Sequence, residues 1–364
     1  MSVNFTPIFQ ITPTITADLA LIEQARQQIQ VLPLTPTVLA SLRETARLYT
    51  THYSTMIEGN RLDTGEVVQV LQYDSHFPGR ERDEKEIRGY YVALKQVEQW
   101  AQDSAPLTEQ LIQTLHALVM GSGKLKVRPT PYRDGQNVIR DSMTKAIVYL
   151  PPIAADVPAL MQNLLQWLQV TVRELACPLR AAIAHYQFAT IHPYYDGNGR
   201  TARLLTTLIL HSGGYDLKGL YSLEEYYARN LPAYYAAISV GPSHNYYQGR
   251  AEADITDWVE YFIGGMAEAC AKVVQQMQAA AKRQAGDRSE LLRQLDPQQR
   301  QLLTLFQQVE FVTNAQIAAL FGYSAVTTRK LCDELVATGF LELATSDRQQ
   351  LRYKLAALYQ GLLE

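Results

Sequence analysis

The sequence lacks the marks of a secreted or membrane-spanning protein. Its three cysteines, Cys177, Cys270 and Cys332, lie far apart without metal-ligand spacing, so we expect neither a disulfide framework nor a cysteine metal site. No apolar run is long enough to cross a bilayer, and residues 1–10 lack the basic region and apolar stretch of a signal peptide. These absences predict a cytoplasmic protein with no membrane partner.

The sequence also lacks an excess of either charge. It has 33 lysines and arginines against 36 aspartates and glutamates, a net charge of −3, which gives no indication of nucleic-acid binding. Hydrophobic residues make up 47% and charged residues 19%, an ordinary globular balance, and 364 residues are enough for two domains.

Helical periodicity is what the chain has in plenty. Apolar residues recur at three- and four-residue intervals through most of the first 211 residues, which predicts a mainly α-helical fold. The expected helices span 17–30, 35–54, 83–102, 107–120, 158–171, 178–191 and 198–211.

Two parts of the chain depart from this pattern. Residues 132–152 contain β-prone pieces at 137–140 and 146–150 around a polar centre, which indicates a β-hairpin or an irregular surface loop. Residues 279–296 are charged and helix-prone and suit a linker. The remainder resembles a small winged helix-turn-helix unit, with helices at 297–309, 315–321 and 326–338 and a two-stranded wing at 340–344 and 351–354.

The segment that carries most chemistry is residues 191–203, IHPYYDGNGRTAR. A helix should end before Pro193, because the residue before a proline is pushed out of the α region. A new helix should begin near Gly197 and Gly199. The N–H groups and positive dipole end of a helix start attract an anion, and glycines allow it to approach closely.

Four side chains near this helix start suit work on a polyphosphate. Arg200 and Arg203 can reach the same anion, Asp196 can hold Mg²⁺, and His192 can act as a general base. A Gly-x-Gly turn before a helix, or a histidine before a proline, is common and unspecific alone. Their conjunction in one short segment favours phosphate chemistry.

These residues resemble the signature of the Fic family, His-x-Phe-x-(Asp/Glu)-Gly-Asn-Gly-Arg-x-x-Arg. The sequence departs from it at Tyr194, where Phe is usual, so the ring is kept but its hydroxyl needs a partner. The resemblance covers roughly residues 40 to 240 and implies a Fic-type helical bundle with a β-hairpin flap. It also implies protein adenylylation, in which AMP from ATP is joined to a Tyr, Thr or Ser hydroxyl and pyrophosphate leaves.

The resemblance implies a role for each residue of the signature. His192 would deprotonate the target hydroxyl, and Asp196 would hold Mg²⁺ bridging the α- and β-phosphates. The rest would bind ATP, with Gly197, Asn198 and Gly199 cradling phosphate oxygens, Arg200 on the β-phosphate and Arg203 on the γ-phosphate.

Residues 54–59, STMIEG, resemble the inhibitory motif of the same family, (Ser/Thr)-x-x-x-Glu-(Gly/Asn), through Ser54 and Glu58. The resemblance implies that Glu58 forms a buried, bidentate pair with Arg203 and blocks the γ-phosphate site. By itself, a glutamate near a helix end is better interpreted as a solvated or capping residue. In some relatives the same glutamate helps to remove AMP from the target, and the sequence leaves that activity open.

Position within the family suggests two further assignments. The flap, residues 137–149 with Asn137 and Tyr149 at its ends, would dock the target chain by strand pairing. Asn230, in the tyrosine-rich stretch 226–235, would hydrogen-bond to adenine, although tyrosines at this spacing also suit an ordinary core. His185 is interpreted as a satisfied core histidine rather than a second base.

The C-terminal unit leaves a second function open. Arg329 and Lys330 on its expected recognition helix favour DNA binding, whereas its nearly neutral charge favours a protein-interaction or dimer module. Our main hypothesis is a self-inhibited adenylyltransferase, and the alternative is a transcription regulator that only senses ATP. The expected domains are an N-terminal helical region at 1–105, a catalytic core at 106–285 and the winged helix at 286–364, with a homodimer left open. Wing residues Arg348, Arg352 and Lys354 are the best support for DNA binding.

Overall fold

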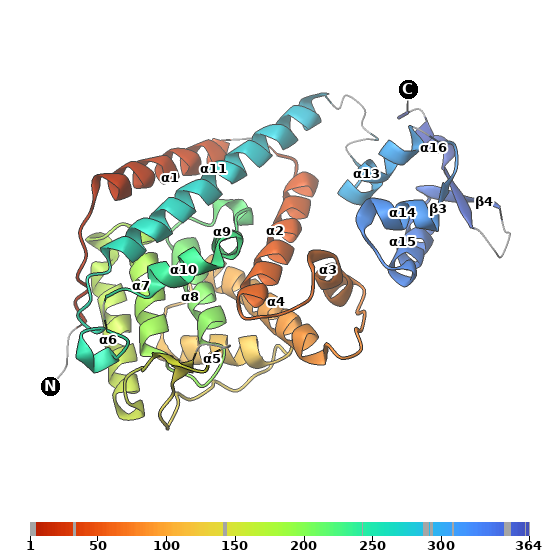
Figure 1. Cartoon of the computed structure of the whole chain (residues 1–364). Coiled ribbons are helices and arrows are strands. Elements are labelled where there is room, and N and C mark those ends of the chain that lie inside the picture. The colour runs from red at the N-terminus through yellow and green to blue at the C-terminus, as the bar shows by residue number, and fades with distance from the viewer. Residues whose placement is uncertain are drawn as a thin grey trace.

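In the computed structural model, helices make up most of the chain and the strands are few and short (Figure 1). The predicted mainly α-helical fold is therefore confirmed. The structure describes residues 5–31, 34–140, 144–241, 243–286, 291, 294–307, 309–345, 351–360 and 362–363.

The centre of the bundle is α7 (Cys177–Ile191), which is buried on almost every side. It packs against α8 (Asn198–Ser212), and α4 (Glu81–Gln102) and α5 (Glu109–Met120) pack on the other side of α8. The bounds of α7 and α8 lie within one residue of those predicted. A helix surrounded by protein needs no solvated polar face, and the polar residues of α7, Arg180, His185, Gln187 and Thr190, are buried with the rest.

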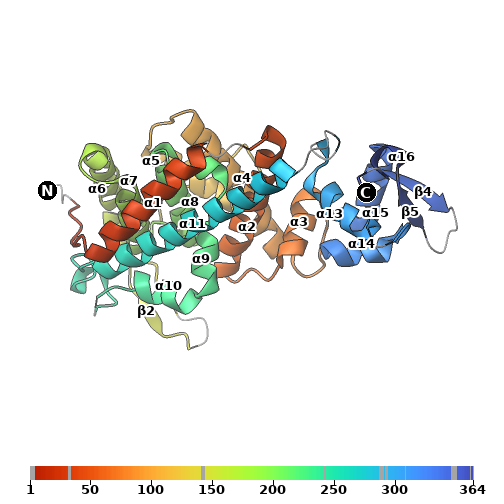
Figure 2. The ribbon, with the colours of Figure 1, turned by 90° about the horizontal axis from the view of Figure 1, so that it is seen from above.

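An outer layer of helices covers this centre. Figures 1 and 2 show α1 (Pro13–Val31) and α11 (Thr256–Gly286) lying together across one face of the bundle. One continuous hydrophobic cluster runs from Ile15 to Met277, so the predicted ranges 1–105 and 106–285 share a core. The other helices of the bundle are α2 (Pro36–Ile57), α6 (Val157–Val170), α9 (Leu223–Arg229) and α10 (Leu231–Ile238), with 3-10 turns η1 (Ala154–Asp156), η2 (Thr171–Arg173), η3 (Leu217–Gly219) and η4 (Tyr246–Gln248).

Helix α3 (Thr64–Gln72) was not predicted from the sequence. It begins with a capping box, in which Asp63 accepts from the backbone N–H of Glu66 and the Glu66 side chain accepts from the N–H of Asp63. Its apolar side forms a small cluster with α2 and α4 that is separate from the main core. The helix follows directly on the turn that contains Glu58.

The flap is a hairpin and not an irregular loop. Strands β1 (Ile139–Arg140) and β2 (Ile147–Tyr149) pair antiparallel, and residues 141–143 between them lie outside the described residues. The Tyr149 hydroxyl donates to Thr190 O at 2.8 Å, which fastens the flap to the last turn of α7.

The C-terminal unit has its own hydrophobic cluster. Three helices, α13 (Pro297–Phe306), α14 (Asn314–Phe321) and α15 (Ala325–Ala337), precede the wing, and Thr313 and Ser324 cap the last two as predicted. The two-stranded wing needs a correction, because β3 (Val312–Thr313) adds a third strand in the order β3-β5-β4. Strands β4 (Leu341–Thr345) and β5 (Arg352–Leu355) pair antiparallel, α16 (Ala357–Gln360) follows, and Arg348 lies outside the described residues.

The C-terminal unit lies at one end of the bundle, beside α3 (Figures 1 and 2). Lys330 on α15 donates from Nζ to Tyr73 O at 3.2 Å. Tyr73 is the C-cap residue of α3, so this bond joins the C-terminal unit to that helix. The prediction that α15 reads DNA stays a prediction. In the described part of the chain, no helix is both long and apolar enough to cross a membrane.

Candidate active site

The site begins where α7 ends at His192. His192 takes left-handed dihedrals, with φ 52° and ψ 60°, and not the extended conformation that a following proline favours. Such a conformation is uncommon for a residue with a side chain and is held by its surroundings. Here the His192 N–H donates to Phe188 O at 3.0 Å, and the chain turns into the loop that leads to α8.

The His192 ring has one nitrogen engaged. Its Nδ1 lies 3.3 Å from Ala189 O, and since a carbonyl can only accept, the proton is on Nδ1 and Nε2 keeps its lone pair. Burial lowers the pKa of His192 to about 4, which the Ala189 carbonyl and the Glu58 charge only partly oppose. The imidazole is therefore neutral at pH 7 and has an acceptor available.

The loop between the two helices is held by side chains on both sides. Asn198 folds back on Tyr194, accepting from its N–H at 2.9 Å and donating to its carbonyl at 2.8 Å. His116 on α5 lies with Nε2 2.9 Å from Asp196 O, and its ring stacks on Tyr194 with centroids 3.7 Å apart. Gly197 has φ +75°, a backbone conformation that favours glycine, and a Cβ there would also crowd Met120 Sδ at 2.8 Å.

Tyr194 keeps the packing role of the usual phenylalanine, with its side chain only 2% exposed. Its hydroxyl finds no hydrogen-bond partner among the residues that the structure describes. No described side chain or carbonyl thus provides the partner that a tyrosine hydroxyl needs at this position. The hydroxyl is therefore a buried polar group that packing does not explain.

Arg133 ties the start of the flap to the His192 turn, which the sequence did not predict. Its Nε donates to His192 O at 2.9 Å and its Nη1 to Gly135 O at 3.0 Å. Its backbone N–H donates to Pro193 O at 2.9 Å. The side chain is buried without a carboxylate partner among the described residues, and this burial lowers the pKa of Arg133.

The start of α8 is already in contact with a carboxylate. A Cβ built on Gly199 would lie 2.2 Å from Glu58 Oε1, so this oxygen sits directly against the backbone of the first helical turn. Helix starts attract anions because their N–H groups point outward and the dipole is positive there. Glu58 itself caps α2, with its N–H donating to Thr55 O, and Gly59 then turns the chain with φ +91°.

Arg203 joins the end of α2 to α8. Its Nε donates to Ser54 Oγ at 2.7 Å, and its Nη2 donates both to Ser54 O at 2.8 Å and to Glu58 Oε1 at 2.9 Å. The expected bidentate pair with Glu58 is wrong in this respect, because a single Arg–Glu hydrogen bond forms and Nη1 has no partner among the described residues. Ser54 occupies the Nε–Nη2 edge of the guanidinium. Only the edge formed by Nη1 and Nη2 is left for the Glu58 carboxylate.

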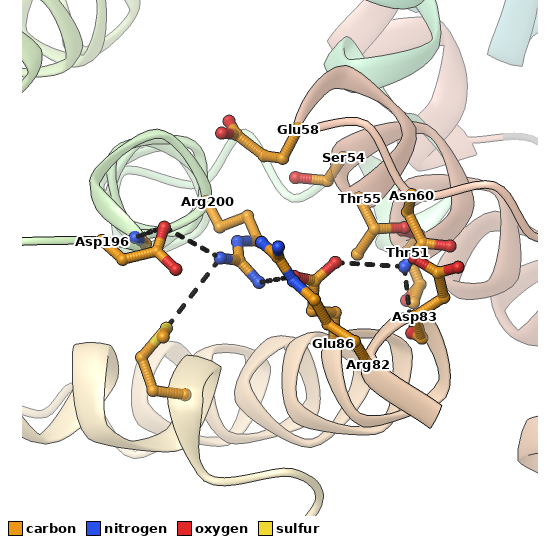
Figure 3. A network of polar contacts seen from close by, with 12 residues as sticks. Thr51, Ser54, Thr55, Glu58, Asn60, Arg82, Asp83, Glu86, Asp196 and Arg200 are labelled. Carbon is orange, nitrogen blue, oxygen red and sulfur yellow. Dashed lines mark hydrogen bonds and ion pairs between the residues drawn. The ribbon is translucent and has the colours of Figure 1, made fainter. Parts of the chain in front are cut away.

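Arg200 points to the other side of α8. Figure 3 shows it between Asp196 and Glu86, whose oxygens lie 3.5 Å from Nη2 and 3.8 Å from Nη1. Glu86 on α4 also accepts from Nδ2 of Asn60 at 3.2 Å. Asn60 lies two residues after Glu58 in the chain. Both arginines are 2% exposed, so neither points to bulk solvent, but the two have different partners here. The Asp196 side chain is 59% exposed.

The fold thus brings most of the predicted site residues to the start of α8. Asn230 lies on a different element, at the start of α10. It is exposed, and its side chain accepts from Ala233 N–H at 3.2 Å as the N-cap of that helix. His185 is a core histidine, with ring nitrogens 3.1 Å from Thr206 Oγ1 and from Tyr234 OH. Burial lowers the pKa of His185 to about 3, so it stays neutral.

Comparison with known proteins identifies the centre of the bundle. Residues 106–210 match the model of the Fic/DOC family. The chain contains a Fic domain. The matched range holds His192, the loop and all but the last two residues of α8, whereas Ser54, Glu58 and Asn230 lie outside it.

Two relatives of this Fic domain are named for an adenylyltransferase activity. The chain is 32% identical over 166 residues to protein adenylyltransferase Fic of Drosophila erecta and 31% identical to that of Drosophila melanogaster. The match covers 45% of this chain and 32% of each fly protein, so the chain spans about a third of the length of these relatives.

Solved structures support the fold over a longer range. A Fic family protein from Desulfovibrio desulfuricans G20 is 25% identical, with a TM-score of 0.63 over 97% of this chain and 99% of the other. A Fic-domain signalling protein from Bacteroides thetaiotaomicron is 25% identical, with a TM-score of 0.61 over 72% of this chain and 97% of the other.

The residues that sequence reasoning missed around the Fic domain share one property. His116, Glu86 and Arg133 reach the site from other elements, and none stands in a local motif. The sequence indicates one of these neighbours only weakly, because His116 and Met120 are one helical turn apart on α5. Any amphipathic helix shows the same spacing, so it could not have identified the site.

Proposed function

We propose that the chain is a protein adenylyltransferase that moves AMP from ATP to a hydroxyl of a target protein, and that Glu58 inhibits it. The observation that carries this proposal is the position of the Glu58 carboxylate. It lies against the backbone of Gly199 and accepts a hydrogen bond from Arg203 Nη2. A carboxylate in that position occupies the place of a phosphate. The names of the fly relatives support AMP transfer as the reaction.

His192 is the proposed general base. Its Nε2 lone pair takes the proton of a Tyr, Thr or Ser hydroxyl while that oxygen forms a bond to the α-phosphorus of ATP. The bond from the α-phosphorus to the oxygen bridging to the β-phosphate breaks, and pyrophosphate leaves. A positioned base typically contributes about 10²–10⁴-fold in rate.

The start of α8 and its arginines are the proposed phosphate site. Gly197, Asn198 and Gly199 present the first-turn backbone, Arg200 serves the β-phosphate and Arg203 the γ-phosphate. Burial of both guanidinium groups strengthens their interaction with a phosphate relative to the same groups in water. Catalysis of phosphoryl-type transfer depends mostly on such positioning and charge stabilisation.

The residues present fit a bound Mg²⁺ with one protein carboxylate. Asp196 Oδ1 accepts from Gly197 N–H at 2.6 Å, while Oδ2 accepts no hydrogen bond from a described residue. No group of three or more His, Cys, Asp or Glu side chains forms a metal site in the described ranges. Magnesium often binds through one carboxylate with phosphates and waters, and it would here neutralise phosphate charge.

Inhibition follows from competition for Arg203. The γ-phosphate of a productively bound ATP needs the open edge of the guanidinium, and the Glu58 carboxylate holds that edge at 2.9 Å. While Glu58 stays, ATP can bind only with its phosphates displaced from the α8 start. A role of Glu58 in AMP removal is tested separately, with an adenylylated target offered in the absence of ATP.

The flap and Asn230 complete the proposal. Ile147 and Val148 on β2 are exposed, which suits strand pairing with an extended target segment between Asn137 and Tyr149. Asn230 uses Oδ1 to cap α10, so its Nδ2, which has no described partner, is left to donate to a ring nitrogen of adenine.

The test is incubation of full-length Glu58→Gly protein with a cell lysate and ATP labelled on either the α- or the γ-phosphate. Adenylylation transfers the α-label and not the γ-label to protein, whereas a kinase would transfer the γ-label. His192→Ala in the same background is the matched control and should transfer neither. No α-label on any protein would reject the proposal and favour the ATP-sensing alternative, and a purified adenylylated target offered without ATP tests AMP removal.

A further inference from the structure

The end of the flap is held by a segment that lies far from it in the sequence, residues 243–250. Leu150, which follows directly on β2, donates its N–H to His244 O at 2.8 Å. Its carbonyl accepts from the N–H of Tyr246 at 3.0 Å. The flap therefore continues beyond β2 into backbone hydrogen bonds with the segment that follows α10.

Arg250, the last residue of this segment, contacts the flap and α7 at the same time. Its guanidinium carbon lies 5.5 Å from the ring centroid of Tyr149 and 5.2 Å from that of Tyr186. Tyr149 ends β2 and Tyr186 belongs to α7, and both side chains are buried. A cation is attracted to an aromatic ring, and the attraction is stronger where water is excluded. One side chain thus bridges the flap and the helix that ends at His192.

The end of α10 determines where the Arg250 side chain points. Its Nη1 donates to Val240 O and its Nη2 donates to Ile238 O. Ile238 is the last residue of α10, where carbonyls have no partner within the helix and an arginine can satisfy them. Because the guanidinium is a planar fork, two carbonyls on its two terminal nitrogens fix its direction.

Both ends of the flap are fastened to the last turn of α7. At one end, Arg133 donates to His192 O. At the other, the Tyr149 hydroxyl donates to Thr190 O at 2.8 Å, two residues before His192, and Arg250 packs on the same tyrosine ring. A target segment that pairs with the flap would therefore receive its distance from the His192 ring from these two anchors. A misplacement of about 1 Å at a reacting group can cost about 10²-fold in rate.

We infer that Arg250 is a positioning residue for the target protein. It holds the flap against α7, so that a strand-paired target presents its hydroxyl to His192. This inference rests on the proposed function, because it takes the flap as the surface that docks the target. The hydrogen bonds of Arg250 go to the last turn of α10 and not to its start at Asn230, so Arg250 should matter for transfer to protein and not for ATP binding.

The test uses full-length Glu58→Gly protein with Arg250→Met, which keeps the length of the side chain and removes the guanidinium. The amides of Leu150 and Tyr246 should exchange with deuterium about tenfold faster, the scale of one hydrogen bond to a charged group. The amide of Arg133, bonded at the other end of the flap, should exchange as before. Transfer of α-labelled AMP to lysate proteins should fall about tenfold, and ATP affinity measured by titration calorimetry should not change.

Arg26→Met in the same background is the matched control. Its guanidinium carbon lies 5.1 Å from the ring centroid of Tyr215, a similar contact that involves α1 and not the flap. It should change neither exchange in the flap nor transfer. Arg250→Lys keeps a charge but not the fork that binds two carbonyls, and should give intermediate exchange and transfer. Thermal unfolding of each variant reports its fold.

The outcomes separate this inference from the proposed function. Unchanged exchange at Leu150, or unchanged transfer despite faster exchange there, would overturn the positioning role. Faster exchange at Arg133 as well, or an equal loss of ATP affinity and transfer, would also overturn it, because Arg250 would then support the whole fold. A Glu58→Gly parent that transfers no α-label rejects the proposed function and the docking role with it. Exchange needs no ATP, so faster exchange at Leu150 would distinguish that failure from a wrong assignment of the Arg250 contacts.

Discussion

Glu58 and Arg203 are 145 positions apart in the sequence, and their side chains meet at 2.9 Å over the backbone of Gly199. The contact joins the end of α2 to the first turn of α8 and places a negative charge at a positive helix end.

Removing the Glu58 carboxylate should activate the protein. Glu58→Gly frees the open edge of Arg203, and we expect transfer of α-labelled AMP to rise by at least about tenfold, the scale of one charge-assisted hydrogen bond. Glu58→Gln keeps the shape without the charge and should give an intermediate rise. Equal activity of the three proteins would contradict an inhibitory role for this contact.

Gly199→Ala should inactivate the protein whether or not Glu58 is present. The added Cβ would lie 2.2 Å from Glu58 Oε1 and 3.3 Å from Arg203 Nη1, so it displaces the carboxylate but also fills the phosphate position. Gly264→Ala is the matched control, because its Cβ meets only Asp18 Oδ2 at 3.5 Å. A Gly199→Ala protein as active as Glu58→Gly would place the phosphates elsewhere.

His192→Ala should lower AMP transfer by about 10²-fold or more while leaving ATP affinity unchanged. In the Glu58→Gly background, transfer should show no inflection near the ordinary histidine pKa, because burial lowers the pKa of His192 to about 4 and the ring is neutral throughout neutral pH. Rates measured from about pH 6 to about pH 8 check this, and a fall centred near 6.5 that is absent from His192→Ala would mean that burial does not lower the pKa of His192.

Tyr194→Phe should keep activity and stabilise the fold. The Tyr194 hydroxyl is buried without a described partner, so removing it relieves an unmade hydrogen bond while the ring still stacks on His116. The expected gain in unfolding free energy is about 1 kcal/mol, measured by chemical denaturation. A loss of stability would mean that a water or another group satisfies the hydroxyl.

Acid should destabilise the protein partly through His185. Its pKa is lowered to about 3 by burial, so below the ordinary value the unfolded chain binds a proton that the folded chain does not. Stability from this group is present above about pH 6.5 and is lost as pH falls, by up to about 1.4 kcal/mol per pH unit. His185→Gln should lose less stability between pH 7 and pH 5 than the parent. Parallel pH dependence of the two proteins would contradict the assignment.

The parts of the fold with long, regular periodicity could be predicted. Helices α7 and α8 and the capped helices of the C-terminal unit lie within a few residues of their expected places. Helix α3 is short and capped by polar side chains, and β3 pairs only two residues, so neither leaves a periodic pattern. Their structure comes from packing against α4 and pairing with β5.

The candidate site divides in the same way. His192, Asp196 and the arginines of α8 lie in one contiguous segment, so their chemistry could be read from their order. His116 lies 80 positions from its partner Asp196, and Arg133 lies 59 positions from its partner His192. Such contacts depend on how helices pack and have no local signal in a single sequence.

Arg133 holds the flap to the His192 turn using backbone carbonyls alone, those of Gly135, Pro152, Ile191 and His192. Because no side chain of the flap takes part in this clamp, the exposed β2 residues Ile147 and Val148 can be exchanged without loosening it, whereas Tyr149 itself anchors the flap to α7. If the flap docks the target as proposed, specificity can change at these outward positions while the His192 turn keeps its place, and a designer who wants a new target can confine changes to them.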